Sequence, residues 1–152
     1  MAMSQSASER QASQTEQGTW NKLVAFHTQV SELVEKTLQD RFGLSLSEYT
    51  ALEALARVSG SDRPGLRMQA LAEAVGMNQS SVSRLVTRLE RQDLVERIHY
   101  EKDRRGVFTA ITASGRETLD AAVPTYLQTL AAAFDRANAD PDLRELVQRI
   151  GS

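Results

Sequence analysis

Apolar side chains recur every three or four residues from Trp20 to Leu38, a spacing that places them on one side of an α-helix. Phe26 and Leu33 widen this stripe, so we expect the helix to contact more than one neighbour. Gly43 is suited to end it as a C-cap. The stripe consists of Trp20, Leu23, Val24, His27, Val30, Val34 and Leu38.

A second helix is predicted after Ser45, because Ser45 and Glu48 form the S-x-x-E pattern of a capping box. Its apolar stripe stops near Val58. The residues over 59–65 are dense in Ser, Gly, Asp and Pro, and they predict a loop.

Shorter elements are predicted beyond this loop. The two segments expected to form strands are rich in Val, Ile, Thr and aromatic residues, and a charged stretch that ends in Gly106 joins them. Pro124 lies inside the longest helical pattern and is compatible with a kink. In chain order we expect a helix over 69–75, a turn at 76–78, a helix from the N-cap Asn78 to about Gln92, strands over 94–100 and 107–111, a helix from Thr112 through Phe134, and a final helix over 143–150.

Length and composition favour a single helical domain. A chain of 152 residues can bury one core, and aromatic residues make up only 5%, which favours helices over a β-sandwich. There is no apolar run long enough to span a membrane. The absence of cysteine excludes disulfides and thiolate catalysis.

Residues 1–18 differ from the rest of the chain. They consist mainly of Ser, Gln, Ala and Glu without an apolar stretch, a composition that predicts an unstructured tail and no secretory signal. We therefore expect a cytoplasmic protein whose folded domain covers 19–152.

Charge is unevenly distributed, although the net charge is only −2. From Arg63 to Arg105 there are nine Lys and Arg against six Asp and Glu, whereas the remaining residues carry nine basic and fourteen acidic groups. A basic middle between acidic flanks is what a DNA-contacting segment on a near-neutral protein would show.

The helix predicted after Asn78 has two different sides. Its apolar side consists of Val82, Leu85, Val86 and Leu89. Its polar side carries Gln79, Ser80, Ser83, Arg84, Thr87, Arg88 and Arg91. The major groove of DNA admits one helix, and Gln and Arg side chains can each form two hydrogen bonds with a base edge. A solvated surface helix shows the same pattern, so both interpretations stay open for this helix taken alone.

The hairpin that follows favours the DNA interpretation. Its charged tip carries Lys102, Arg104 and Arg105, placed where a β-wing could enter the adjacent minor groove. A helix, a short turn, a polar-faced helix and a basic hairpin occur in that order, as in a winged helix-turn-helix.

Two segments resemble the MarR family of transcriptional regulators. Residues 71–90, LAEAVGMNQSSVSRLVTRLE, resemble the family's helix-turn-helix. The stretches 103–107, DRRGV, and 111–115, ITASG, resemble its wing pattern, Asp-x-Arg followed by Leu-Thr-x-x-Gly, with Ile111 as a conservative departure. The resemblance spans roughly Trp20 to Ile150.

The resemblance implies a mainly α fold with a small β-hairpin wing. The winged helix-turn-helix lobe would cover about 45–111, and the helices over 19–42 and 112–152 would form a dimerisation layer. The implied function is that of a homodimeric, sequence-specific regulator that binds double-stranded DNA at a pseudo-palindromic site. Residue by residue, DNA contact falls on Gln79, Ser80, Ser81, Ser83, Arg84, Thr87, Arg88, Arg104 and Arg105, and Asp103 would orient a wing arginine.

Many members of this family are repressors that a small anionic or phenolic effector releases from DNA. Trp20, His27 and Tyr49 are the candidates for lining such a pocket, and a place in the dimer core is the competing interpretation. No cofactor or metal is expected, because the only other histidine is His99 and no cysteine is present.

The sequence contains no G-x-S-x-G, P-loop, H-E-x-x-H or dinucleotide-binding pattern, so we do not expect an enzyme. The remaining alternative is a winged helix that binds another protein, without a ligand response. Such modules lose the basic face, and the arginines at 84, 88, 104 and 105 argue against that loss.

Overall fold

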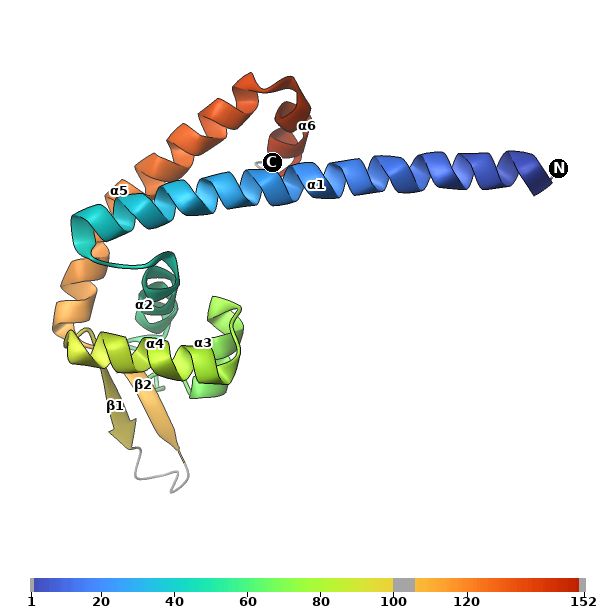
Figure 1. Ribbon diagram of the computed structural model, residues 1–152. Helices are drawn as coiled ribbons and strands as arrows, with labels where there is room; N and C mark the ends of the chain where they lie inside the picture. Colours follow the sequence, from blue (N-terminus) through green and yellow to red (C-terminus); the bar gives the residue numbers. More distant parts are fainter. Residues whose placement is uncertain (1, 100–105, 151–152) are drawn as a thin grey trace. The chain divides into compact units, whose positions relative to one another are not determined.

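The structure is a computed structural model that describes residues 2–99 and 106–150. Within these residues the chain forms six helices and one pair of strands (Figure 1). They are α1 (Ala2–Phe42), α2 (Leu46–Val58), α3 (Met68–Val75), α4 (Gln79–Arg91), β1 (Val95–His99), β2 (Val107–Ile111), α5 (Ala113–Ala139) and α6 (Pro141–Ile150). The mainly helical fold with a small β-hairpin, expected from the sequence, is confirmed.

The chain divides into two compact units. One comprises the residues up to Val34 and those from Gln128 onward, and the other spans Glu35–Leu127. The helices α1 and α5 each contribute to both units. In neither unit does a described helix have the length and apolar character needed to cross a membrane.

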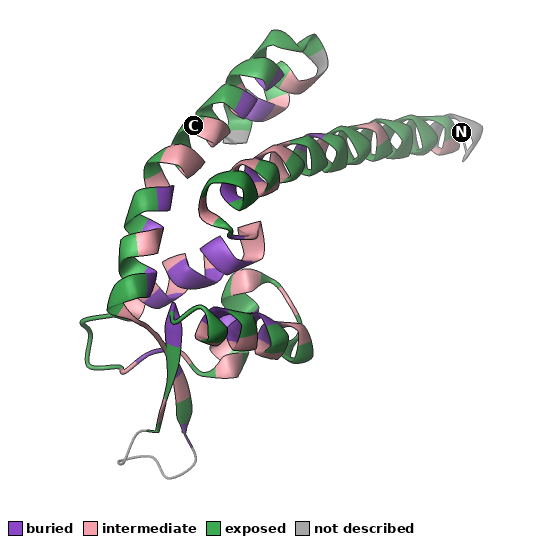
Figure 2. Ribbon diagram, turned by 60° about the vertical axis from the view of Figure 1, so that its left-hand side comes forward, coloured by how far each residue is buried: buried purple, intermediate pink, exposed green. Residues whose placement is uncertain are grey.

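The second unit is built around the apolar sides of α2, α3 and α4. Leu52, Leu71, Leu85 and Leu89 are fully buried there, and α2 is among the most buried elements (Figure 2). The predicted apolar side of α4 is buried throughout. Because the three helices cover one another's apolar sides, the polar side of α4 is left to solvent.

Local capping signals fix the ends of these helices. The backbone N–H of Glu48 donates to Ser45 Oγ at 3.0 Å, and that of Ser81 donates to Asn78 Oδ1 at 2.8 Å. Gly76 ends α3 in the left-handed conformation, with φ 73°, a region that glycine adopts without strain. The turn between α3 and α4 therefore lies where the sequence predicts it.

The strands β1 and β2 pair antiparallel, with Arg97 opposite Thr109. The sequence did not predict a further partner at the free edge of β2. Leu66 and Thr109 exchange two backbone hydrogen bonds, of 2.9 and 2.8 Å. Gly65 permits this approach, because a Cβ atom there would lie 2.1 Å from the carbonyl oxygen of Thr109.

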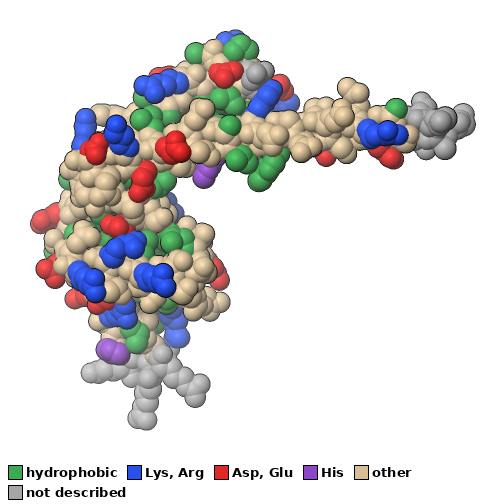
Figure 3. All heavy atoms as spheres, in the orientation of Figure 1, with side chains coloured by type: hydrophobic (Ala, Val, Ile, Leu, Met, Phe, Trp, Pro, Cys, Tyr) green, Lys and Arg blue, Asp and Glu red, His purple; other side chains and the backbone are tan. Residues whose placement is uncertain are grey.

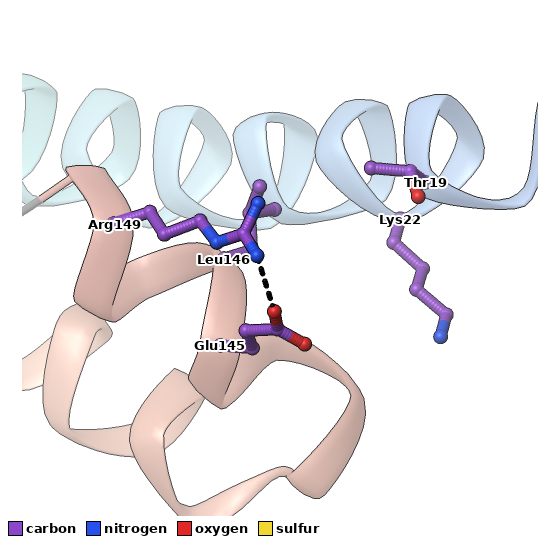
Figure 4. A pocket seen from close by; sticks show the side chains of 5 residues that line it. All are labelled: Thr19, Lys22, Glu145, Leu146 and Arg149. Carbon is purple, nitrogen blue, oxygen red and sulfur yellow. Dashed lines mark hydrogen bonds and ion pairs between the residues drawn. The ribbon is translucent and has the colours of Figure 1, made fainter. Parts of the chain in front are cut away.

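The first unit has a small core of its own. Phe26, Ala137 and Val147 are buried together, and the rings of Phe26 and Phe134 meet edge to face with centroids 5.5 Å apart. Side chains of α1 and α6 also line a shallow surface pocket of about 170 Å³, where Glu145 and Arg149 form an ion pair (Figure 4).

The start of α1 differs from the expected unstructured tail, because helix extends from Ala2. Adding residues to an existing helix avoids the cost of nucleation, and this stretch contains Ala, Gln and Glu but no proline. Thr15 and Thr19 each donate a side-chain hydrogen bond to the carbonyl four residues earlier. Residues 7–17 are all exposed (Figure 2), so this part of the helix contacts no core.

Candidate nucleic-acid interface

The polar side of α4 carries the residues expected to contact DNA. Gln79, Ser80, Arg84 and Arg88 are exposed, and the remaining ones on this helix, Ser81, Ser83 and Thr87, are half-buried. Figure 3 shows Lys and Arg side chains gathered over α4. The helix therefore combines a fully buried apolar side with an exposed side that contains both hydrogen-bonding and cationic groups.

Asn78 organises the first turn of α4. Its Oδ1 accepts from the backbone N–H of Ser81 at 2.8 Å and from Ser80 Oγ at 2.9 Å. The hydroxyl proton of Ser80 is thus engaged by the cap, which leaves the oxygen of that hydroxyl to act as an acceptor. Gln79 is exposed beside this turn.

Thr87 is held by two neighbours. Its hydroxyl donates to the carbonyl oxygen of Ser83 at 2.9 Å and accepts from Arg97 Nη2 at 3.4 Å. Arg97, on β1, also forms an ion pair with Glu90 through an Nε–Oε1 distance of 2.6 Å. This network ties the hairpin to α4. Sequence reasoning missed Arg97, because only the packing of β1 beside α4 brings it to this helix.

The arginines of α4 differ in their surroundings. Arg88 Nε lies 3.6 Å from Oε1 of Glu48, a buried residue of α2. Arg84 and Arg91 are exposed, and neither forms an ion pair with another described residue. Their positive charge is therefore available to a polyanion.

Beside the edge of β2 that Leu66 bridges, Arg67 places its guanidinium 5.1 Å from the centroid of the Phe108 ring, within cation–π range. These two residues help to line a pocket of about 390 Å³ beside the start of α3. Neither residue carried a signal in the sequence, because their meeting depends on the bridge between Leu66 and Thr109.

The predicted wing residues Asp103, Arg104 and Arg105 lie outside the described residues. The strands that lead to them, β1 and β2, are paired over their full described length. The roles assigned to the wing tip therefore remain predictions.

The residues expected to line an effector pocket lie in different units. Trp20 and His27 are exposed on α1, whereas Tyr49 is buried in the second unit and stacks on Tyr126 at 4.3 Å between ring centroids. Burial, with a smaller contribution from the carboxylate of Glu53, raises the pKa of Tyr49 to about 12. Its phenol therefore stays protonated at neutral pH.

No three His, Cys, Asp or Glu side chains of the described residues gather closely enough to hold a metal ion.

Fold and site together define a winged helix-turn-helix protein, and comparisons with known proteins identify its family. The MarR family model matches residues 42–106. AbsC of Streptomyces coelicolor, a MarR family transcriptional regulator, is 34% identical with a TM-score of 0.73, over 90% of this chain and 89% of AbsC. Sco3205 is a MarR family transcriptional regulator of the same organism, and its structure was solved in complex with DNA. It is 30% identical with a TM-score of 0.73, and the match covers 90% of this chain and 82% of Sco3205.

The transcriptional regulator HosA of Escherichia coli is 33% identical over 81 residues, which is 53% of this chain and 56% of HosA. The chain thus spans little more than half the length of this curated relative. Because AbsC is 34% identical and is matched over 89% of its length, the chain belongs to the MarR family. The relatives named here are regulators of transcription and not enzymes.

Proposed function

We propose that this protein is a homodimeric regulator of transcription that binds double-stranded DNA in a sequence-specific manner. In this proposal α4, the recognition helix, enters the major groove, and the hairpin tip contacts the adjacent minor groove. The observation that carries the proposal is the division of α4, whose apolar side is buried while Gln79, Arg84 and Arg88 are exposed. The DNA complex of Sco3205 gives it independent support. A regulator that binds chromosomal DNA would act in the cytoplasm.

Selection from a pool of random duplexes tests this function. A dimer with two recognition helices should enrich a two-fold-symmetric site whose halves lie about one helical turn, roughly 10 base pairs, apart. A folded protein that enriches no sequence would favour the alternative, a winged helix that binds another protein. The exposed arginines of α4 argue against that alternative.

Arg84 offers the most direct test of the recognition helix. We expect Arg84→Ala to weaken binding to the enriched site by about 1–3 kcal/mol, because a bidentate arginine–base contact contributes that much discrimination. Arg57→Ala is the matched control, since Arg57 is exposed on α2 and paired with Glu53. Fluorescence anisotropy at fixed salt measures both variants. Equal affinities for wild type and Arg84→Ala would remove this side chain from the interface.

The dimer in this proposal forms through α1 and the helices that follow β2. Trp20 is 62% exposed and Val24 43%, and they lie four residues apart on one side of α1. Large apolar side chains exposed together mark an interaction surface, and we propose that a second copy of the chain covers this one.

Trp20→Asp should therefore convert the dimer to monomer, with a loss of at least ~2 kcal/mol, because tryptophan is among the residues that dominate interfaces. Sedimentation equilibrium measures the association. Ala25→Asp is the control, because Ala25 is exposed on a different side of α1. A Trp20→Asp protein that remains dimeric at the same concentrations would place the interface elsewhere.

We further propose that the protein is a repressor and that a small anionic or phenolic compound releases it from DNA. The candidates that the sequence suggested for binding this compound lie in different units, Trp20 and His27 in the first and Tyr49 in the second, and the dimer proposed above would also cover Trp20. Competition by simple aromatic acids in the anisotropy assay tests the response, and DNA binding that none of them alters would count against it.

A further inference from the structure

Glu48 is a buried carboxylate beneath the recognition helix. The residue is only 6% exposed, although it lies in the first turn of α2. Its Oε1 is 3.6 Å from Arg88 Nε, and its Oε2 is buried without a hydrogen-bond partner within the described part of the chain. Arg88 itself is half in solvent, with 54% of its side chain exposed.

Capping of α2 does not account for this side chain. The reciprocal bond of a capping box would join the Glu48 carboxylate to the backbone N–H of Ser45, but one oxygen faces Arg88 and the other has no partner among the described residues. The first N–H of α2, that of Leu46, donates to the carboxylate of Glu35 instead. The Glu48 side chain is thus directed toward α4.

A contribution to the stability of the fold also explains the burial of Glu48 poorly. A buried carboxylate loses hydration, and an ion pair of this kind often stabilises a fold no better than apolar residues of similar volume. An oxygen without a partner makes the balance less favourable still. What the pair does provide is restraint of Arg88, whose long side chain would otherwise sample many rotamers on the exposed side of α4.

The charge of Glu48 has a second consequence for DNA. Binding to DNA of any sequence depends mainly on cations that neutralise phosphates. Glu48 offsets the charge of Arg88 and so weakens this general attraction. On a matching site, the same carboxylate holds the guanidinium in place before contact, which lowers the entropy lost on binding.

We propose that Glu48 is a positioning residue for DNA recognition, which acts through Arg88 to favour the matching site over other DNA. The inference rests on the proposed DNA-binding function. The proposed role applies to Arg88 and not to Arg84, because no described acidic residue forms an ion pair with Arg84.

The test compares Glu48→Gln with wild type on two duplexes, the enriched site and a scrambled sequence, at the same salt concentration. Glutamine keeps the shape and removes the charge. We expect tighter binding to the scrambled duplex, no gain on the enriched site, and a ratio of the two affinities that falls about tenfold. A merely structural defect would weaken both affinities together and leave their ratio unchanged. If Glu48→Gln fails to fold, Glu48→Met, of similar volume, enters the same comparison.

Two controls sharpen the result. Glu53→Gln removes the same charge from the same helix, but Glu53 pairs with Arg57 on α2, so the ratio should stay at the wild-type value. In an Arg88→Met background, Glu48→Gln should change the ratio no further, because the residue through which it acts is gone. A wild-type protein that binds neither duplex would contradict the proposed function itself. A discriminating wild type with an equally discriminating Glu48→Gln variant, or an effect that persists without Arg88, would overturn the role of Glu48.

Discussion

Alanine at position 115 should destabilise the protein by at least about 3 kcal/mol, because the backbone leaves no room for a side chain there. A Cβ atom on Gly115 would lie 2.0 Å from the carbonyl oxygen of Leu94 and 2.8 Å from Cγ1 of Ile111. The carbonyl is not free to retreat, since it accepts the backbone N–H of Thr112 at 3.1 Å. Gly115 also donates its N–H to Thr112 Oγ1 at 3.0 Å, at the start of α5.

Urea unfolding followed by circular dichroism measures this effect, and Gly18→Ala is the matched control. Gly18 lies inside α1 with nothing near the position of an added Cβ atom. The same substitution should therefore raise stability there by roughly 0.5–1 kcal/mol, or leave it unchanged, because alanine favours helix over glycine. A Gly115→Ala protein as stable as wild type would mean that Gly115 does not lie against the Leu94 carbonyl as described.

Leu85→Ala should cost about 2–5 kcal/mol of unfolding free energy, because it opens a cavity in the core of the second unit. Leu85 is fully buried on the apolar side of α4. Because Leu85 belongs to the recognition helix, the destabilised variant should also lose DNA binding at lower urea concentrations than wild type.

Arg91→Ala, on the exposed side of the same helix, should change stability by less than about 0.5 kcal/mol. Urea midpoints for the two variants give the comparison. If they shift equally, or if Leu85→Ala leaves the midpoint unchanged, the assignment of the buried side of α4 is wrong.

The parts of the fold that were predictable depend on local signals. The limits of α4 follow from the N-cap Asn78 and from apolar residues at intervals of three and four, both readable within a single helix. The turn at Gly76 and the strand Val107–Ile111 were likewise predictable from neighbouring residues. The extension of α1 to Ala2 was not, because its exposed turns carry no apolar pattern.

The parts that were not predictable depend on contacts between residues far apart in the chain. Arg97 reaches Glu90 only because β1 turns back along α4, and Glu48 reaches Arg88 only because α2 packs beneath that helix. In the sequence Glu48 has the pattern of a capping residue, and nothing nearby indicates a partner forty positions away. The exposed side of the recognition helix could therefore be predicted, but not the side chains that hold it in place.

The salt dependence of DNA binding tests the central proposal most directly. Anisotropy of a labelled duplex carrying the enriched site would be followed from roughly 50 to 300 mM salt, the range over which counterion release dominates. We predict tight binding at low salt that weakens steeply, linear in the logarithm of the salt concentration, as several arginines displace ions from phosphates. A folded dimer that does not bind, or whose binding is indifferent to salt, would contradict the assignment of α4 to DNA.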